Sequence, residues 1–197
     1  MEKYYFDEAQ PRLTVGDGVV LLLINGKEET EISDGMPDEN GLMTTEAVER
    51  KVWVYDGVRL ETGGMTSEAA LTAAAQKMVL AEIEKHDTSS AVNGFMLNGQ
   101  RVWLDFELRD RVYQGNERLK NVGREETTLW FGDKCYNMSI EQAQSIISHI
   151  EAYAKDCYNA TAQHKANVSA METVEEVLGY DYTKGYPEKL TISLREK

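Results

Sequence analysis

The chain has 197 residues, with 34 acidic and 21 basic side chains and a formal net charge of −13 at pH 7. A hydrophobic content of 42% with three prolines is typical of a globular protein and excludes a disordered chain. The acidic balance argues against nucleic acid as the main partner, because an acidic surface repels the phosphate backbone.

Nothing in the sequence predicts export or membrane insertion. The first ten residues, MEKYYFDEAQ, lack the basic region and apolar core of a signal peptide. The longest apolar run, Val19 to Ile24, is far shorter than the ~20 residues that a membrane helix needs. The two cysteines, Cys135 and Cys157, do not form the framework of a disulfide-rich protein. We therefore expect a soluble, cytoplasmic protein with no membrane partner.

Four turn dipeptides predict β-hairpins. They are Asn25-Gly26 after the run 19–24, Asp56-Gly57 between 52–55 and 58–60, Asn98-Gly99 between 95–97 and 101–104, and Gly132-Asp133 between 129–131 and 134–136. Asn-Gly and Asp-Gly favour type I′ turns and Gly-Asp suits type II′, and both types match the twist of paired strands. An earlier Gly16-Asp17-Gly18 predicts a tight turn and not a phosphate-binding loop, since a strand follows it. Segment 26–50 reads as a long acidic loop with one strand at 29–33.

Three shorter helices are expected besides one long helix. The first covers 67–85, with Thr66 as its cap and Met65 and Ala70 as a hydrophobic staple. The second covers 106–120 after Asp105, and Gly115 predicts that it is weak or broken. Its charged residues, Arg109 among them, are expected on an exposed face. Thr173 and Glu176 form a capping box for a short helix that ends near Gly179, and 191–194 reads as a last strand.

The long helix is predicted over 140–171, where Ser139 and Gln142 form a capping box. Its apolar stripe alternates gaps of three and four residues, the pattern of a heptad seam. The stripe consists of Ile140, Ala143, Ile147, Ile150, Ala154, Cys157, Thr161, His164, Val168 and Met171. Tyr153 and Tyr158 are expected off the stripe. Either helix 67–85, which is rich in small residues, folds back on this seam, or a second copy of the chain covers it.

These elements predict the α+β class. We expect a small N-terminal β module over 1–62, and a domain over 63–197 with short β-hairpins and one long C-terminal helix, with the boundary near Gly63-Gly64.

The sequence offers no motif for catalysis, and we expect no catalytic, cofactor-binding or metal-binding residues and no cofactor. Cys157 and His164 share a helix face but lie about 10 Å apart along the axis at ~1.5 Å per residue, too far for one zinc ion. We therefore expect His164 and Thr161 to be polar residues of the seam, which either lie at a boundary between two helices or fix the register in which the helices pack. An enzyme stays an alternative if His149 or His164 lies beside a carboxylate in a deep pocket.

A carbohydrate- or surface-binding module is the other alternative. Exposed Trp53 or Trp103 beside a tyrosine would favour it, and Tyr180, Tyr182 and Tyr186 gather in the tail.

Residues 78–190 carry a set of short motifs that resembles one family. The motifs are Glu82-Ile83, 87–95 (DTSSAVNGF), 97–99 (LNG), 102–105 (VWLD), Arg111, 123–125 (GRE), 127–131 (TTLWF), 150–153 (IEAY), 156–159 (DCYN), 161–164 (TAQH), 180–183 (YDYT) and 185–190 (GYPEKL). They resemble a family of unknown function from phages and prophages of gut bacteria, often in predicted tail-fibre or tail-assembly proteins.

The resemblance implies a non-enzymatic structural or assembly role in a phage tail, baseplate or fibre, exercised by protein binding. It implies a location in the cytoplasm of the host bacterium or in the virion. Protein partners, including phage tail components, and a homo-oligomer are expected. Residues 1–62 lie outside the resemblance and are expected to form a variable partner-binding module.

Overall fold

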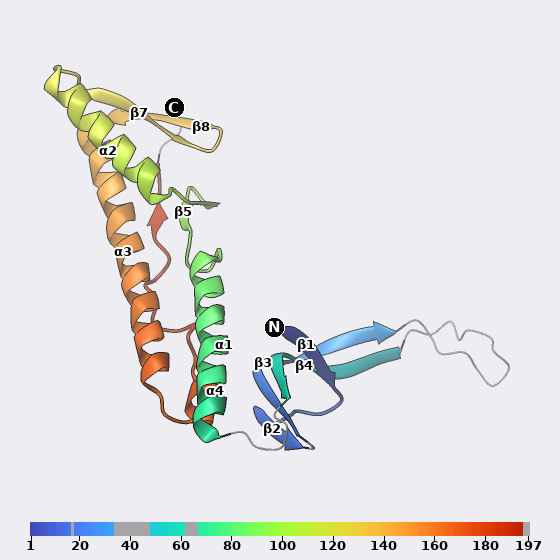
Figure 1. Cartoon of the computed structure of the whole chain (residues 1–197). Coiled ribbons are helices and arrows are strands. Elements are labelled where there is room, and N and C mark those ends of the chain that lie inside the picture. The colour runs from blue at the N-terminus through green and yellow to red at the C-terminus, as the bar shows by residue number, and fades with distance from the viewer. Residues whose placement is uncertain (17, 34–47, 62–66, 195–197) are drawn as a thin grey trace. The chain divides into compact units, whose positions relative to one another are not determined.

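A computed structural model describes residues 1–16, 18–33, 48–61 and 67–194 (Figure 1). The fold is α+β, as predicted. Contacts divide the chain into unit 1, Met1–Ala81 with Val168–Asp181, and unit 2, Glu82–Asn167 with Tyr182–Lys197. The boundary predicted near Gly63-Gly64 lies outside the described residues, and the division by contacts falls within the first helix instead.

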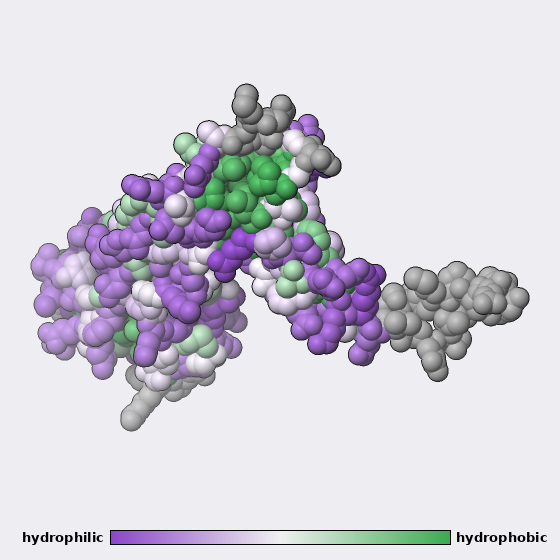
Figure 2. Space-filling view, turned by 90° about the horizontal axis from the view of Figure 1, so that it is seen from below, coloured by the Kyte–Doolittle hydropathy of each residue, from purple (hydrophilic) through white to green (hydrophobic). Residues whose placement is uncertain are grey.

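Unit 1 contains an antiparallel sheet of four strands in the order β1-β4-β3-β2. The strands are β1 (Glu2–Phe6), β2 (Leu13–Gly16), β3 (Val19–Ser33) and β4 (Val48–Glu61). Gly16 pairs with Val19 at the start of the β2–β3 ladder, and Asp17 of the tight turn predicted there lies outside the described residues. Apolar rows such as Val15–Val20–Leu60 cross three strands on one face of the sheet, and Figure 2 shows hydrophobic residues gathered on this part of the molecule.

The predicted turn at Asn25-Gly26 is wrong, because β3 continues through it. The register shifts between Ile24 and Lys27, so that Asn25 and Gly26 oppose the single residue Tyr55. This is a β-bulge, and Asn25 takes the positive φ of 55° that the dipeptide favours. The ring of Tyr55 lies directly over Gly26, where any Cβ would collide with it. The glycine is therefore required by packing and not by a chain reversal.

The predicted turn at Asp56-Gly57 is also wrong, because β4 runs unbroken through both residues. Gly57 pairs with Glu2 on one side and with Leu23 on the other. The predicted loop over 26–50 is wrong where the structure describes it, since 26–33 and 48–50 are strand, although the strand expected at 29–33 is confirmed. Residues 34–47 of that segment lie outside the described residues.

Strands β3 and β4 continue past their neighbours as a two-stranded ribbon (Figure 1). Strand β2 pairs with β3 only as far as Leu22, and β1 pairs with β4 only from Trp53 to Gly57. We call Lys27–Ser33 and Val48–Val52, which pair with each other, the β-arm. Within the described residues no strand pairs with either outer edge of the β-arm.

Helix α1 (Glu68–Thr88) contributes to both units. The predicted cap Thr66 and the staple residue Met65 lie outside the described residues, and the Ser67 hydroxyl accepts a hydrogen bond from the Ala70 amide at 3.3 Å. Within unit 1, the side-chain amide of Gln76 donates to the Met171 carbonyl at 2.9 Å. Helix α4 (Val174–Gly179) has the predicted capping box of Thr173 and Glu176 and contacts β3.

Unit 2 is built around helix α3 (Ile140–Ala170), which confirms the long helix. Its predicted box is present, since Ser139 Oγ accepts from the Gln142 amide at 3.2 Å and Gln142 Oε1 accepts from the Ser139 amide at 3.3 Å. The hairpins β5 (Phe95–Leu97)–β6 (Gln100–Val102) and β7 (Glu126–Phe131)–β8 (Lys134–Ser139) both form as predicted. Asn98, Gly99 and Gly132 take positive φ in their turns.

The last strand, β9 (Thr191–Ile192), adds in parallel to β5, which gives the order β6-β5-β9. The larger of two buried clusters described in unit 2 forms where α3 meets both hairpins. Its buried members are Phe95, Leu97, Leu104, Leu129, Phe131, Tyr136, Ala143, Ile147 and Ile150.

Helix α2 (Phe106–Asn121) is continuous, so the break expected at Gly115 is wrong. Asp105 caps it as predicted, with its side chain accepting from the Leu108 amide at 2.8 Å. Asn116 on its inner face accepts a hydrogen bond from the Thr127 hydroxyl at 2.9 Å and so connects α2 to β7. Contacts with neighbouring elements thus outweigh the weak helix propensity of one glycine.

Candidate functional site

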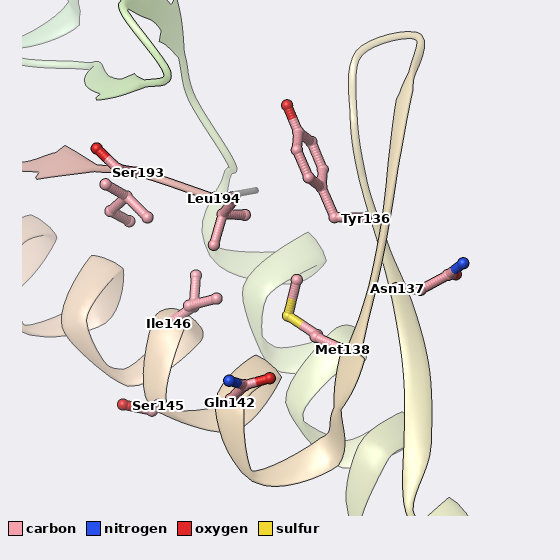
Figure 3. A pocket seen from close by; sticks show the side chains of 9 residues that line it. Tyr136, Asn137, Met138, Gln142, Ser145, Ile146, Ser193 and Leu194 are labelled. Carbon is pink, nitrogen blue, oxygen red and sulfur yellow. The ribbon is translucent and has the colours of Figure 1, made fainter. Parts of the chain in front are cut away.

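One candidate site is a groove in unit 2 between β8, the start of α3 and the residues around β9 (Figure 3). Its volume is about 550 Å³, within the range of ligand sites. We call it the core groove. Its lining consists of Tyr136, Asn137, Met138, Gln142, Ser145, Ile146, Ile192, Ser193 and Leu194. Met138 and Ile146 approach one another across it, whereas Asn137 points away (Figure 3).

One wall of the core groove is fastened by Asn98 in the β5–β6 turn. Its side-chain amide donates to the Leu194 carbonyl at 2.8 Å, and its Oδ1 accepts from the Leu194 amide at 2.8 Å. The Asn98 backbone amide also donates to the Ile192 carbonyl at 3.0 Å. One residue thereby continues the pairing of β5 and β9 beyond the end of β5, and it positions Leu194 against the groove.

A second pocket, of about 420 Å³, lies between α2 and α3. Arg109 forms its inner wall, with Nε 2.6 Å from Glu151 Oε2 and an Nη1 that donates to the Leu104 carbonyl at 2.5 Å. The guanidinium lies 5.4 Å from the ring centre of Trp103, a cation–π distance. The rings of Phe106 and Tyr113 line the outside of the pocket.

The expectation of an exposed Arg109 is wrong, because only 6% of the residue is exposed. Its carboxylate partner, Glu151, lies 42 positions later and has a side chain that is 46% exposed. A half-exposed carboxylate keeps much of its hydration, so this pair forms without the full desolvation cost of two buried charges. The arrangement orients α2 on α3 and leaves the aromatic rings at the surface.

A third cluster joins α1, α3 and the tail within unit 2. We call His86, Asp87, Thr161, His164, Tyr182 and Tyr186 the His–Tyr cluster. Tyr186 lies between the two histidines, with ring centres 5.2 Å from His86 and 5.3 Å from His164. The Thr161 hydroxyl donates to Asp87 at 2.7 Å and lies 2.9 Å from the Tyr186 hydroxyl. The polar seam positions Thr161 and His164 therefore face α1 and the tail of the same chain, one of the two arrangements predicted for the seam.

Burial lowers the pKa of His86, a positive charge on His164 would lower it further, and the Asp87 carboxylate opposes both. Burial likewise raises the pKa of the Cys157 thiol and of the Tyr153 hydroxyl on the same face of α3. Among the described residues, no three side chains of the metal-binding types gather at one point. His149 is exposed and bonds through Nδ1 to the Ser145 carbonyl at 2.7 Å.

Several aromatic residues lie elsewhere than expected. Tyr153 and Tyr158 were both expected off the stripe, but Tyr153 is buried with Val92 and Cys157, whereas Tyr158 is exposed. Trp53 is half-buried and stacks on Tyr55, and Trp103 is half-buried, so neither presents the open ring that would favour carbohydrate binding. The cysteines are both free thiols.

Only one feature of the sequence indicates the core groove. Ile146, next to the seam residue Ile147, widens the apolar stripe beyond what one seam uses. The sequence predicts Asn98 as a turn residue only, because its hydrogen bonds to Leu194 span 96 positions. No local pattern predicts the burial of Arg109, since its partner Glu151 lies 42 positions later.

Comparison of the chain with protein-family models, with curated proteins and with solved structures finds no match. In the part of the chain that the structure describes, the helices are too short or too polar to cross a membrane.

Proposed function

We propose that this chain is a non-enzymatic, protein-binding component of a phage or prophage tail, baseplate or fibre, or a chaperone that assembles one. Its place of action is the cytoplasm of the host bacterium or the virion. The resemblance of residues 78–190 supports the phage context, and the β-arm supports the binding mode.

The β-arm is the single observation that carries the binding mode. Strand β3 has 15 residues, whereas its neighbour β2 has only 4, so the outer part of β3 has an open edge among the described residues. Strand β4 likewise has an open edge from Val48 to Val52, because β1 pairs with it only from Trp53 to Gly57. Open edges offer backbone amides and carbonyls to another strand, which is the physical basis of partner recognition by strand addition.

The charges of the β-arm limit which partner it accepts. Its β3 half carries Glu28, Glu29 and Glu31 against the single cation Lys27. Lys51 on β4 lies 3.1 Å from Glu28, and Arg50 pairs with Asp7 beyond β1. The remaining acidic surface disfavours random edge-to-edge association between copies and favours a partner strand with basic side chains.

The test is co-purification of the tagged full chain with particles or with a tail or fibre subunit. We expect a defined phage protein to accompany it, and Glu31→Lys in the β-arm to abolish that association. The matched control is Glu107→Lys, the same charge change at an exposed position of α2. Absence of the chain from particles, together with no associated tail protein, contradicts the proposal. Light scattering on the purified chain then gives its oligomeric state. A trimer favours a fibre component, and a monomer favours a chaperone.

A further inference from the structure

We propose that the core groove binds an extended, uncharged segment of a partner polypeptide, with one apolar side chain of that segment seated between Met138, Ile146 and Leu194. This site lies in unit 2. It does not depend on the partner proposed for the β-arm.

The floor of the core groove is an unfinished part of the hydrophobic core. Met138, Ile146, Ile192 and Leu194 pack against the buried cluster of unit 2, yet each of them is only partly buried. Their remaining apolar surface faces the groove, as Met138, Ile146 and Leu194 do in Figure 3. An apolar side chain placed there would continue the packing of the core and displace water from apolar surface.

The backbone beside the groove offers an open strand edge. Leu190 and Ile192 accept hydrogen bonds from β5 and its turn, and Leu194 bonds to the Asn98 side chain through both its amide and its carbonyl. Since backbone groups of successive strand residues point to opposite sides, Thr191 and Ser193 direct theirs away from β5. No strand among the described residues pairs with that edge of β9. An extended segment can therefore bond there while its side chain enters the groove.

The lining also specifies the charge of the occupant. None of the nine lining residues is acidic or basic, although 28% of the chain is charged. The polar side chains of the lining, those of Gln142, Ser145 and Ser193 among them, are all neutral. A charged side chain would lose hydration here and gain no partner of opposite charge, so it is rejected.

The probe is a capped six-residue peptide in which threonine alternates with leucine, titrated into the full chain and followed by amide NMR. We expect saturable shifts at residues 136–138, 145–146 and 191–194. The same peptide with lysine in place of leucine should bind at least about tenfold more weakly, because it places a charged side chain in a groove that has no charged lining residue. A leucine peptide with N-methylated threonines should also bind weakly, because it cannot bond to the edge of β9.

On the protein side, Ile146→Lys should abolish the shifts, whereas Ala152→Lys, at an exposed position of the same helix, should leave them unchanged. Circular dichroism checks that both variants are folded. If Ile146→Lys does not fold, the comparison of the three peptides with the unmodified chain still tests the proposal. Equal binding of the leucine and lysine peptides, shifts that map elsewhere, or no saturable shifts overturn the proposal. The proposal is also overturned if the chain forms a dimer and Ile146→Lys abolishes that dimer, since a second copy would then occupy the core groove.

Discussion

The substitution Gly57→Ala should destabilise unit 1, because Gly57 lies where three strands approach closely. A Cβ at this position would lie 2.8 Å from Leu23 Cδ2 and 2.9 Å from both Tyr4 Cδ2 and the Leu22 carbonyl oxygen. Carbon atoms in good contact are about 3.5–4.0 Å apart. The two side chains can rotate, but the carbonyl belongs to the paired backbone of β3. We therefore expect a loss of about 1–3 kcal/mol in the free energy of unfolding, the usual cost of overpacking.

The matched control is the same chemical change at Gly115. A Cβ there meets nothing within 4 Å, and the residue lies inside α2. Alanine should therefore stabilise the helix by roughly 0.5–1 kcal/mol, the usual difference between the two residues. Opposite signs for one substitution separate the effect of packing from that of backbone freedom.

Urea titration followed by hydrogen exchange and peptide mass analysis measures both effects, because it reports β3 and β4 separately from α2. The reasoning about Gly57 is refuted if Gly57→Ala leaves the protection of β3 and β4 unchanged or increases it. The reasoning about Gly115 is refuted if Gly115→Ala lowers the protection of α2.

Three further predictions concern unit 2. Ile150→Ala removes a fully buried side chain from the core and should lower the free energy of unfolding by about 2–5 kcal/mol. Urea titration measures this loss, and a smaller value would show that the core relaxes into the cavity. The pKa of His86 is lowered in the folded protein, so the unfolded chain binds a proton at His86 more readily. Protonation of His86 therefore favours unfolding. The protein is fully stable in this respect above about pH 6.5 and loses stability as the pH falls toward the lowered pKa of His86. Thermal melts between pH 8 and pH 5 should therefore show a decline in melting temperature that His86→Gln reduces, and an equal decline in that variant would contradict the prediction. A thiol reagent should modify the exposed Cys135 rapidly in the native protein, whereas the buried Cys157, whose pKa is raised, should react only after unfolding; fast modification of both would contradict the burial.

Elements determined by local chemistry were predicted well. The capping boxes at Ser139 and Thr173 involve residues three positions apart, and the seam of α3 repeats over many turns, so the sequence contains all the information they need. The Asn98-Gly99 turn formed for the same reason, because both residues take the positive φ that the dipeptide favours.

Features determined by remote residues were not predicted. Asn25-Gly26 has the same composition as Asn98-Gly99, yet it forms a bulge because Tyr55 covers Gly26 and β4 pairs on both sides of it. Arg109 is buried, and its guanidinium pairs with a carboxylate 42 positions away. In each case a contact far along the chain outweighed a local preference, and no short window of sequence contains that contact.

Both units depend on residues between Val168 and Ile192, which are synthesised after most of the strands and helices that they contact. Unit 1 includes Val168–Asp181, where α4 contacts β3, and unit 2 includes β9, which pairs with a strand about ninety positions earlier. Neither unit can therefore complete its folding while the ribosome still holds this stretch. Until this stretch has left the ribosome, α4 cannot contact β3 and β9 cannot pair with β5, so part of the apolar surface of each strand stays open to a chaperone that shields it.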